Sequence, residues 1–322
     1  MKIAINGFGR IGRLFYRSAL EHKADFEVVA VNNPGWDEKM YQHLFKYDTA
    51  YGVFDQKPEA KLLGEREPEN LPWREMGVDI VIESTGIFID HAKASKHIRA
   101  GAKKVIISAP SEDADVTLVL GVNEKDYQPE KHQIISMASC TTNCLAPVVK
   151  VLLDEFEMEK GFMTTAHSYT ADQNLQDSSH RDLRRARAAA ENIVPTKTGA
   201  AKAIFKVIKG LEGKMDGLAL RVPTATGSVI DLICVLKKNT TPEKLNETFQ
   251  KYAEGPMQGI LATTEDPIVS SDIIKNDHSS IVDLSLTKVL DGNLVEVIAW
   301  YDNEWGYATR LVDLVNYLQK NS

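Results

Sequence analysis

The sequence has few cysteines and no long hydrophobic run, and each absence excludes a class of protein. Its 322 residues include three cysteines, Cys140, Cys144 and Cys234, which are too few for a disulfide scaffold. No stretch approaches the ~18 apolar residues of a membrane span, and the first residues lack the apolar run of a signal peptide. We therefore expect a cytoplasmic protein without membrane attachment, in which each thiol is either core filler or a reagent.

An excess of positive charge is also missing. The chain has 45 acidic against 38 basic residues, a net charge of -7, which argues against a general nucleic-acid binder. One basic run lies at residues 180–187. Alone it could be a nucleic-acid patch, but in an acidic chain we assign it to subunit contacts and to the attraction of anionic small molecules.

The patterns that are present indicate two domains. Over the first third of the chain, short β-branched runs alternate with amphipathic segments, which predicts βαβ units and a parallel sheet. The segment 54–73 is predicted to be an irregular loop. Strands are predicted at residues 2–6, 26–31, 78–84, 103–108, 117–120 and 133–137, and helices at 10–23, 38–46 and 91–100.

After residue 139 the pattern changes. A helix is predicted from Cys140 to about Phe156, and the longer strands that follow leave room for few parallel crossovers. This indicates an α+β domain with a largely antiparallel sheet. Strands are predicted at residues 218–222, 228–236, 281–286 and 294–300, and helices at 199–209, 242–253 and 305–319, the last with an apolar stripe.

A glycine-rich turn, NGFGRIG at residues 6–12, directly follows the first strand and opens a helix. Gly7 permits the tight turn, Gly9 lets a pyrophosphate approach the backbone, and Gly12 lets the helix and strand pack closely. An ordinary turn is the alternative interpretation. The flanking strand and helix favour dinucleotide binding in an α/β Rossmann domain, with the phosphates at the helix N-terminus.

The end of the second strand bears on the choice of dinucleotide. An Asp or Glu is expected there to accept hydrogen bonds from the adenosine ribose, but this strand ends in Asn32-Asn33-Pro34. The Asn33 amide can bond a ribose hydroxyl without repelling a 2′-phosphate, which favours tolerance of NADP. Alternatively, Asn33 is a turn residue and Asp37 or another acid binds the ribose.

The three thiols have different surroundings. Cys140 would lie at the N-terminus of its helix, where the dipole favours the thiolate. Cys144 shares an apolar helical stripe and Cys234 lies in an apolar strand, so both are predicted to be core residues. No further ligands accompany Cys140 and Cys144, so no metal site is predicted. Among eight histidines, His167 ends a β-rich run that could present it to a cleft as a base.

Seven motifs in order resemble those of phosphorylating glyceraldehyde-3-phosphate dehydrogenases over nearly the whole chain. They are NGFGRIGR at 6–13, ESTG at 83–86, ASCTTNC at 138–144, HSYT at 167–170, TGAAK at 198–202, RVPT at 221–224 and WYDNE at 300–304. The resemblance implies a cytoplasmic homotetrameric oxidoreductase of glucose metabolism, acting in glycolysis or gluconeogenesis. It also implies that the C-terminal helix returns to the first domain, so that residues 1–139 and 304–322 bind dinucleotide and 140–303 form the catalytic domain.

The resemblance further implies a chemistry. Cys140 attacks the aldehyde of glyceraldehyde 3-phosphate, and a hydride passes from the thiohemiacetal to the nicotinamide. His167 holds the thiolate as an ion pair, acts as base, and assists attack by inorganic phosphate on the thioester. Two anion pockets are implied: Thr170 and Arg221 for the substrate phosphate, and Ser139, Thr141, Thr198 and Gly199 for inorganic phosphate.

For the cofactor, the resemblance assigns Gly7, Arg10, Ile11, Thr85 and Ser108 to the dinucleotide, Arg66 to the adenine and Asn303 to the nicotinamide carboxamide. Two departures from the NAD-specific family pattern are Asn33 in place of Asp and Ser178-Ser179 in place of Leu-Pro. Both favour NADP as the preferred or an accepted cofactor beside NAD. A third departure is a shortfall of about a dozen residues between Phe54 and Gly64, where the family has an extra hairpin.

Two other functions remain as alternatives. Erythrose-4-phosphate dehydrogenase shares the cysteine and histidine, but its pattern after the histidine departs from the Ser-Tyr-Thr present here. A catalytically silent dinucleotide-binding scaffold is the alternative from another class. The presence of Cys140, His167 and both anion pockets argues against it.

Overall fold

The computed structural model describes residues 1–322, apart from the side chains of residues 201–202, and its chain forms two units. Unit 1 contains residues 1–118, 124–139 and 307–322, and unit 2 contains residues 119–123 and 140–306. Residues 304–306 thus group with unit 2, whereas the sequence placed them in the first domain. The Asp302 carboxylate, which belongs to unit 2, accepts hydrogen bonds from the backbone N–H groups of Glu304 and Trp305 at 2.9 Å each.

Unit 1 is built on a seven-stranded sheet in which every strand pair is parallel. Strand β1 lies between β2 and β6, so the strand order reverses beside it; α/β sheets bind ligands at such a point. In sheet order the strands are β5 (Lys61–Leu63), β2 (Glu27–Asn32), β1 (Lys2–Asn6), β6 (Ile80–Glu83), β7 (Lys104–Ile107), β9 (Ile134–Ser136) and β8 (Val116–Thr117).

Helices α1, α2, α4 and α8 begin where the sequence predicted them, with α1 opening directly from the glycine-rich turn, whereas the short helix α3 was not predicted. The apolar stripe of the last helix is buried, and the Thr309 hydroxyl of that helix contacts the Ser18 hydroxyl of α1 at 2.9 Å. The predicted irregular loop 54–73 is wrong in part, because β5 pairs with β2 within it. The helices are α1 (Arg10–Glu21), α2 (Glu38–Lys46), α3 (Trp73–Met76), α4 (His91–Arg99) and α8 (Trp305–Lys320), and a small hairpin joins β3 (Tyr47–Asp48) and β4 (Gly52–Val53).

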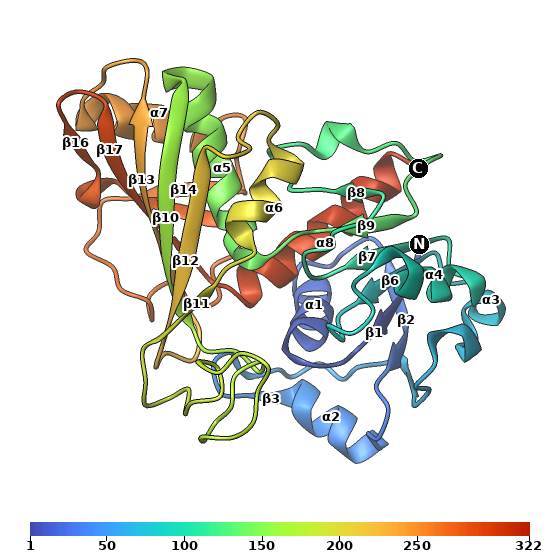
Figure 1. Ribbon diagram of the computed structural model, residues 1–322. Helices are drawn as coiled ribbons and strands as arrows, with labels where there is room; N and C mark the ends of the chain where they lie inside the picture. Colours follow the sequence, from blue (N-terminus) through green and yellow to red (C-terminus); the bar gives the residue numbers. More distant parts are fainter. The chain divides into compact units, whose positions relative to one another are not determined.

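Unit 2 is an eight-stranded mixed sheet with helices α5 (Cys140–Phe156) and α6 (Ala200–Val207) packed on one face (Figure 1). The pairs β10–β12 and β14–β15 are parallel and the other pairs are antiparallel, as expected for a largely antiparallel sheet. In order the strands are β11 (Val194–Lys197), β12 (Met215–Val222), β10 (Met158–Ser168), β13 (Ser228–Leu236), β17 (Leu294–Tyr301), β15 (Ser280–Asp283) and β14 (Leu261–Thr264), with β16 (Lys288–Leu290) beside β17 and helix α7 (Pro242–Glu254) following β13.

Among the described residues, no helix is long and apolar enough to cross a membrane.

Candidate active site

Cys140 is the first residue of α5, as the sequence predicted. Two residues earlier, Ala138 has a φ of +53°, a left-handed conformation that non-glycine residues rarely adopt. Cys140 is partly accessible, whereas Cys144 and Cys234 are buried. Of the three thiols, the structure therefore exposes only the one at a helix N-terminus.

Strand β10 brings His167 to Cys140. The His167 Nε2 atom lies 3.4 Å from the Cys140 Sγ atom. His167 is the next-to-last residue of β10 and pairs with Arg221 in the parallel register of β10 and β12. A nucleophile, a base and a guanidinium are thus held together by a helix start and two paired strands.

The hydrogen bonds of His167 define its tautomer. Its Nδ1 atom lies 2.7 Å from the Ser168 carbonyl oxygen, which can only accept, and 3.1 Å from Arg221 Nη1, which can only donate. Because the contact to the carbonyl is the shorter one, we place the proton on Nδ1. The Nε2 lone pair consequently faces the thiol, and the Cys140 S–H donates to it. This is the orientation that a general base needs to take the thiol proton.

Burial acts on the charges of this pair. It raises the pKa of the Cys140 thiol, although the charge of Arg221 opposes part of that rise. Burial and then the charge of Arg221 lower the pKa of His167 to about 3. Transfer of the proton from Sγ to Nε2 creates both charges together, and their attraction over 3.4 Å offsets part of the cost of burying them.

Arg221 and Thr170 form a cationic pocket beside His167. The Arg221 Nη1 atom donates to the Ser168 carbonyl at 3.1 Å and to the Thr170 hydroxyl at 3.3 Å. Its Nε atom is buried and has no hydrogen-bond partner among the described residues. A guanidinium with unused donors next to a hydroxyl is suited to an anion such as a phosphate.

Arg185 adds a second cation that the sequence did not single out within the basic run. Asp172 and Thr196 hold its guanidinium, the latter through a hydrogen bond of 3.1 Å. Its side chain is 18% exposed, compared with 87% for Arg181. Burial lowers the pKa of Arg221, and the charge of Arg185 lowers it further. The sequence could not identify Arg185, because a run of arginines does not show which side chain is buried.

The predicted inorganic-phosphate residues lie at two helix starts. The Thr141 hydroxyl contacts the hydroxyl of buried Tyr301 at 2.9 Å, and hydrogen bonds from Thr141 to the Cys140 sulfur oppose part of the rise that burial causes in the pKa of that thiol. Thr198 and Gly199 precede α6, where the Thr198 hydroxyl accepts from the Ala200 N–H at 3.2 Å. Ser139 directly precedes Cys140 in the chain. Tyr301 lies in the WYDNE motif, but the sequence gave it no role, because its contact with Thr141 joins residues far apart in the chain.

In unit 1, the glycine-rich turn has the shape that its sequence predicts. Gly7 has a φ of +93°, and a Cβ atom on it would lie 2.7 Å from the Thr85 nitrogen. A Cβ atom on Gly12 would lie 2.2 Å from the Gly7 carbonyl oxygen. The corresponding position on Gly9, the N-cap of α1, meets no atom within 4 Å. The turn is therefore closely packed at Gly7 and Gly12 and open at Gly9, where a pyrophosphate can approach.

The other predicted cofactor residues in this unit make internal contacts. The Arg10 side chain forms an ion pair with Asp48, so its guanidinium is already engaged within the protein. Ile11 is half-buried on the first turn of α1. The Thr85 hydroxyl donates to the Glu83 carboxylate, and the Ser108 hydroxyl donates to the Glu83 carbonyl at 3.0 Å. The side chains of Arg10, Thr85 and Ser108 thus shape the backbone of the turns.

The Asn33 side chain is held at the glycine-rich turn. Its Oδ1 atom accepts from the Phe8 N–H at 2.8 Å, which leaves the amide nitrogen as its outward donor. Asp37, the alternative ribose ligand, caps α2 by accepting from the Met40 N–H at 2.8 Å. Arg66 is exposed in the segment that follows β5, next to the end of β2. An amide rather than a carboxylate therefore occupies the predicted ribose position.

Asn303 lies just after β17 and is oriented by three donors. Its Oδ1 atom receives hydrogen bonds from the Gly227 N–H at 3.1 Å and from the hydroxyls of Ser228 and Ser168 at 2.8 and 2.9 Å. A backbone N–H can only donate, so the atom it meets must be the amide oxygen. The amide nitrogen of Asn303 consequently points away from these groups as a donor.

Comparisons with known proteins agree with this geometry. The NAD binding domain of glyceraldehyde 3-phosphate dehydrogenase matches residues 1–91, and the C-terminal domain of the same enzyme matches residues 139–303. Glyceraldehyde-3-phosphate dehydrogenase 2 of Streptomyces avermitilis is 53% identical over 331 residues, covering 99% of this chain and 98% of that protein. The Geobacillus stearothermophilus enzyme is 51% identical, covering 99% and 98% of the two chains. The chloroplastic glyceraldehyde-3-phosphate dehydrogenase B of Pisum sativum is 54% identical, covering 98% and 73%.

Proposed function

The chain belongs to the glyceraldehyde 3-phosphate dehydrogenase family, and on this premise we propose that it converts D-glyceraldehyde 3-phosphate and inorganic phosphate into 1,3-bisphosphoglycerate with NAD or NADP. The observation that carries the proposal is the 3.4 Å contact between Cys140 Sγ and His167 Nε2 beside the Arg221 and Thr170 pocket. A nucleophile, an oriented base and a phosphate pocket are what this reaction requires.

The first step uses the unprotonated Nε2 atom of His167. It takes the Cys140 proton, the sulfur attacks the aldehyde carbon, and the protonated His167 returns that proton to the former carbonyl oxygen, which gives a thiohemiacetal. His167 then accepts the proton of the thiohemiacetal hydroxyl as the carbon loses a hydride. When bound, NAD or NADP accepts that hydride. A Cys140 thioester remains, and attack on it by inorganic phosphate releases the acyl phosphate and restores the thiol.

The anions are distributed between the two predicted pockets. Arg221 and Thr170 hold the phosphate that glyceraldehyde 3-phosphate already carries. Ser139, Thr141, Thr198 and Gly199 surround the inorganic phosphate, with N–H groups at the starts of α5 and α6 as donors. The charge of Arg185 supports this concentration of anions.

The dinucleotide is held mainly by unit 1, and the chemistry is carried by unit 2. The open approach at Gly9 fits a pyrophosphate, and the donor of Asn303 fits a carboxamide oxygen. Asn33 presents an amide and Ser178-Ser179 present hydroxyls, so no carboxylate among them repels the 2′-phosphate of NADP. The required free thiol of Cys140 fits a reducing cytoplasm.

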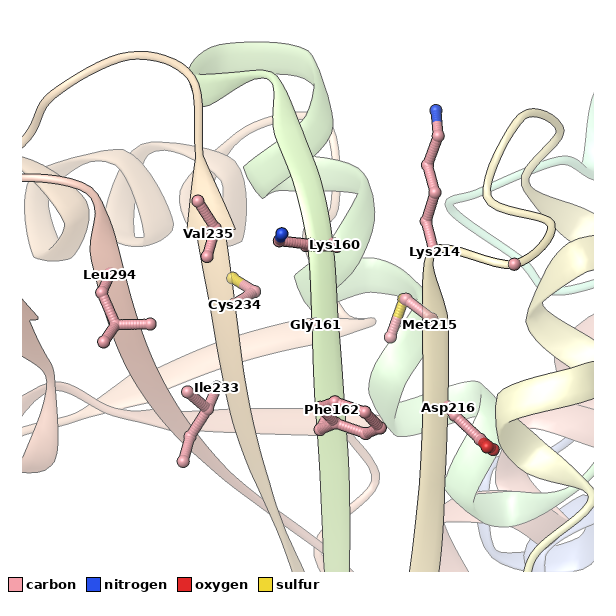
Figure 2. Close-up of a pocket in the computed structure, with 11 residues that line it drawn as sticks. Lys160, Gly161, Phe162, Lys214, Met215, Asp216, Ile233, Cys234, Val235 and Leu294 are labelled. Carbon is pink, nitrogen blue, oxygen red and sulfur yellow. The ribbon is translucent and has the colours of Figure 1, made fainter.

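A homotetramer is supported by an apolar sheet face in unit 2. Phe162, 72% exposed, lies opposite Ile233 in the β10–β13 pair, and Figure 2 shows Ile233 on the strand between those of Phe162 and Leu294. Exposed apolar side chains on three adjacent strands fit the same face of a second copy, because isologous contacts are self-complementary. Phe162→Asp should halve the mass measured by sedimentation or light scattering. An unchanged mass would show that this face is not an interface.

A direct assay tests the proposed reaction. The purified chain should reduce NAD or NADP with glyceraldehyde 3-phosphate only when inorganic phosphate is present. Erythrose 4-phosphate in the same assay tests the nearest alternative substrate, and a clear preference for it would reverse the assignment. Dinucleotide binding without turnover of either aldehyde would indicate a scaffold instead.

A further inference from the structure

Two buried polar residues of unit 1 have no part in the proposed reaction. Glu83, the last residue of β6, is 1% exposed, and His97 on α4 is fully buried. We propose that Glu83 and His97 are positioning residues, which hold the glycine-rich turn in the shape that binds the dinucleotide. The inference rests on the proposed use of NAD or NADP.

From one side, the indole of Trp73 determines the proton position on His97. The Trp73 Nε1–H group donates to the His97 Nδ1 atom at 3.0 Å, and an indole N–H can only donate. Nδ1 is therefore the acceptor, and the proton of the neutral ring lies on Nε2. The Nε2–H group donates to the Glu83 Oε2 atom at 3.0 Å.

On the strand side of Glu83, the backbone N–H of Glu65 determines the amide orientations of Asn32 and Asn6. The Glu65 N–H donates to Asn32 Oδ1 at 2.9 Å, Asn32 Nδ2 donates to Asn6 Oδ1 at 2.7 Å, and Asn6 Nδ2 donates to Glu83 Oε2 at 2.6 Å. Asn6 Nδ2 and His97 Nε2 lie 3.4 Å apart because both donate to this oxygen. Both chains of donors therefore end on Glu83, which must be an acceptor.

The second oxygen of Glu83 builds the turn on which the glycine-rich loop rests. Glu83 Oε1 accepts from the Thr85 N–H at 2.8 Å and from the Thr85 hydroxyl, whose oxygen itself accepts from the Ile87 N–H at 3.0 Å. The Gly7 Cα packs against the Thr85 backbone, and the Ser84 hydroxyl donates to the Gly7 carbonyl at 2.6 Å. A displacement of Thr85 therefore moves Gly7.

The network requires a carboxylate at position 83. Asn6, His97 and the Thr85 N–H all present donors, so a glutamine amide would face a donor with its NH₂ group in either orientation. Glu83→Gln preserves volume but breaks at least one buried hydrogen bond. We expect the Kd for NAD and NADP to rise about 10- to 100-fold, since a lost buried bond commonly weakens an equilibrium by that factor.

The test measures dinucleotide Kd by calorimetry on the full chain, well below its melting temperature. His97→Leu removes the donor to Glu83, whereas His97→Gln keeps an N–H that can reach it. The matched control is Val105→Ala, which opens a cavity in the apolar cluster that contains Trp73 but removes no hydrogen bond of the network. The alkylation rate of Cys140 by iodoacetamide reports on unit 2 independently.

The proposal predicts weaker binding in Glu83→Gln and His97→Leu, recovery in His97→Gln, and parental binding in Val105→Ala, with Cys140 alkylation unchanged throughout. Parental Kd values in Glu83→Gln and His97→Leu would overturn it. Equal weakening in Val105→Ala would also overturn it, because general destabilisation would then explain the loss. If Glu83→Gln does not fold, the two His97 variants decide. A parent chain that binds no dinucleotide would instead refute the proposed function, before any variant is compared.

Discussion

Each unit contains a buried polar cluster near the ends of its strands, and the two clusters use their donors differently. Around Glu83, the N–H groups of Asn6, His97 and Thr85 all end on one carboxylate. Around His167, the Arg221 Nη1 atom lies 3.1 Å from a ring nitrogen that already donates to a carbonyl, and its Nε has no partner among the described residues. A satisfied cluster fixes the backbone, whereas a cluster with unused donors can receive an anion.

The same contrast appears within one helix. Cys140 and Cys144 both lie in the first turns of α5, but only Cys140 faces His167. Burial raises the pKa of the Cys144 thiol well above its usual range, so it stays protonated and inert. The position of each thiol relative to His167, and not its residue type, therefore distinguishes the nucleophilic cysteine from the core cysteine.

Replacing the two thiols in turn gives the largest expected effect. Cys140→Ser should lower kcat for phosphate-dependent reduction of NAD or NADP by at least about four orders of magnitude, because the nucleophile is lost. Dinucleotide Kd should stay near the parental value. Cys144→Ser is the matched control and should retain most of the turnover. Substantial turnover in Cys140→Ser would refute the covalent mechanism.

The second prediction concerns the cluster with unused donors. His167→Asn removes the proton acceptor, so kcat should fall about 10²- to 10⁴-fold. Burial, which raises the pKa of Cys140, then acts without an imidazole that can take the thiol proton. The thiolate fraction at neutral pH should fall, and the alkylation profile should move to higher pH. Iodoacetamide kinetics against pH check this, and a profile superimposable on the parent's would exclude the ion pair.

Sequence patterns predicted the local structure more completely than the side-chain contacts. The bounds of β1, α2, α5 and β13 follow from alternation, from capping residues and from the helix start at Cys140, all of which are local signals. β5 was missed because it has three residues and gains its hydrogen bonds from β2, far along the chain. Short edge strands depend on such partners more than on their own composition.

The residues of the candidate site could be predicted where they belong to a family motif. Which partners their side chains contact could be predicted less well. The family resemblance identified Cys140, His167 and Arg221 as residues of one site, and β10–β12 pairing explains why His167 and Arg221 are neighbours. It did not indicate that Arg10 would pair with Asp48. Ion pairs between distant residues leave no periodic trace in a sequence, so only the fold shows which donors are already used.

The third prediction tests the orientation of Asn303. Its oxygen is saturated, so only its N–H₂ group can meet the nicotinamide carboxamide. In Asn303→Asp, the outward atom becomes a charged acceptor. The 3-acetylpyridine analogue has a carbonyl but no NH₂ group, so its kcat/KM should fall about 10- to 100-fold, whereas NAD can rotate its amide and should lose less. Equal losses for both cofactors would contradict this orientation.

The smallest expected effect concerns the ribose position. Asn33→Asp keeps the acceptor for the Phe8 N–H but replaces the outward amide with a charged oxygen. Two like charges at about 5 Å in water repel by roughly 1 kcal/mol per charge pair, so the 2′-phosphate of NADP should bind less well. The ratio of kcat/KM for NADP over NAD should fall about tenfold, and added salt should reduce the change because it screens exposed charges. Asp37→Asn is the control, since its side chain caps α2 and should leave the ratio unaltered. If Asp37→Asn changes this ratio and Asn33→Asp does not, the ribose is bound by Asp37. The Asp37 carboxylate that caps α2 would then be the group that discriminates between NAD and NADP.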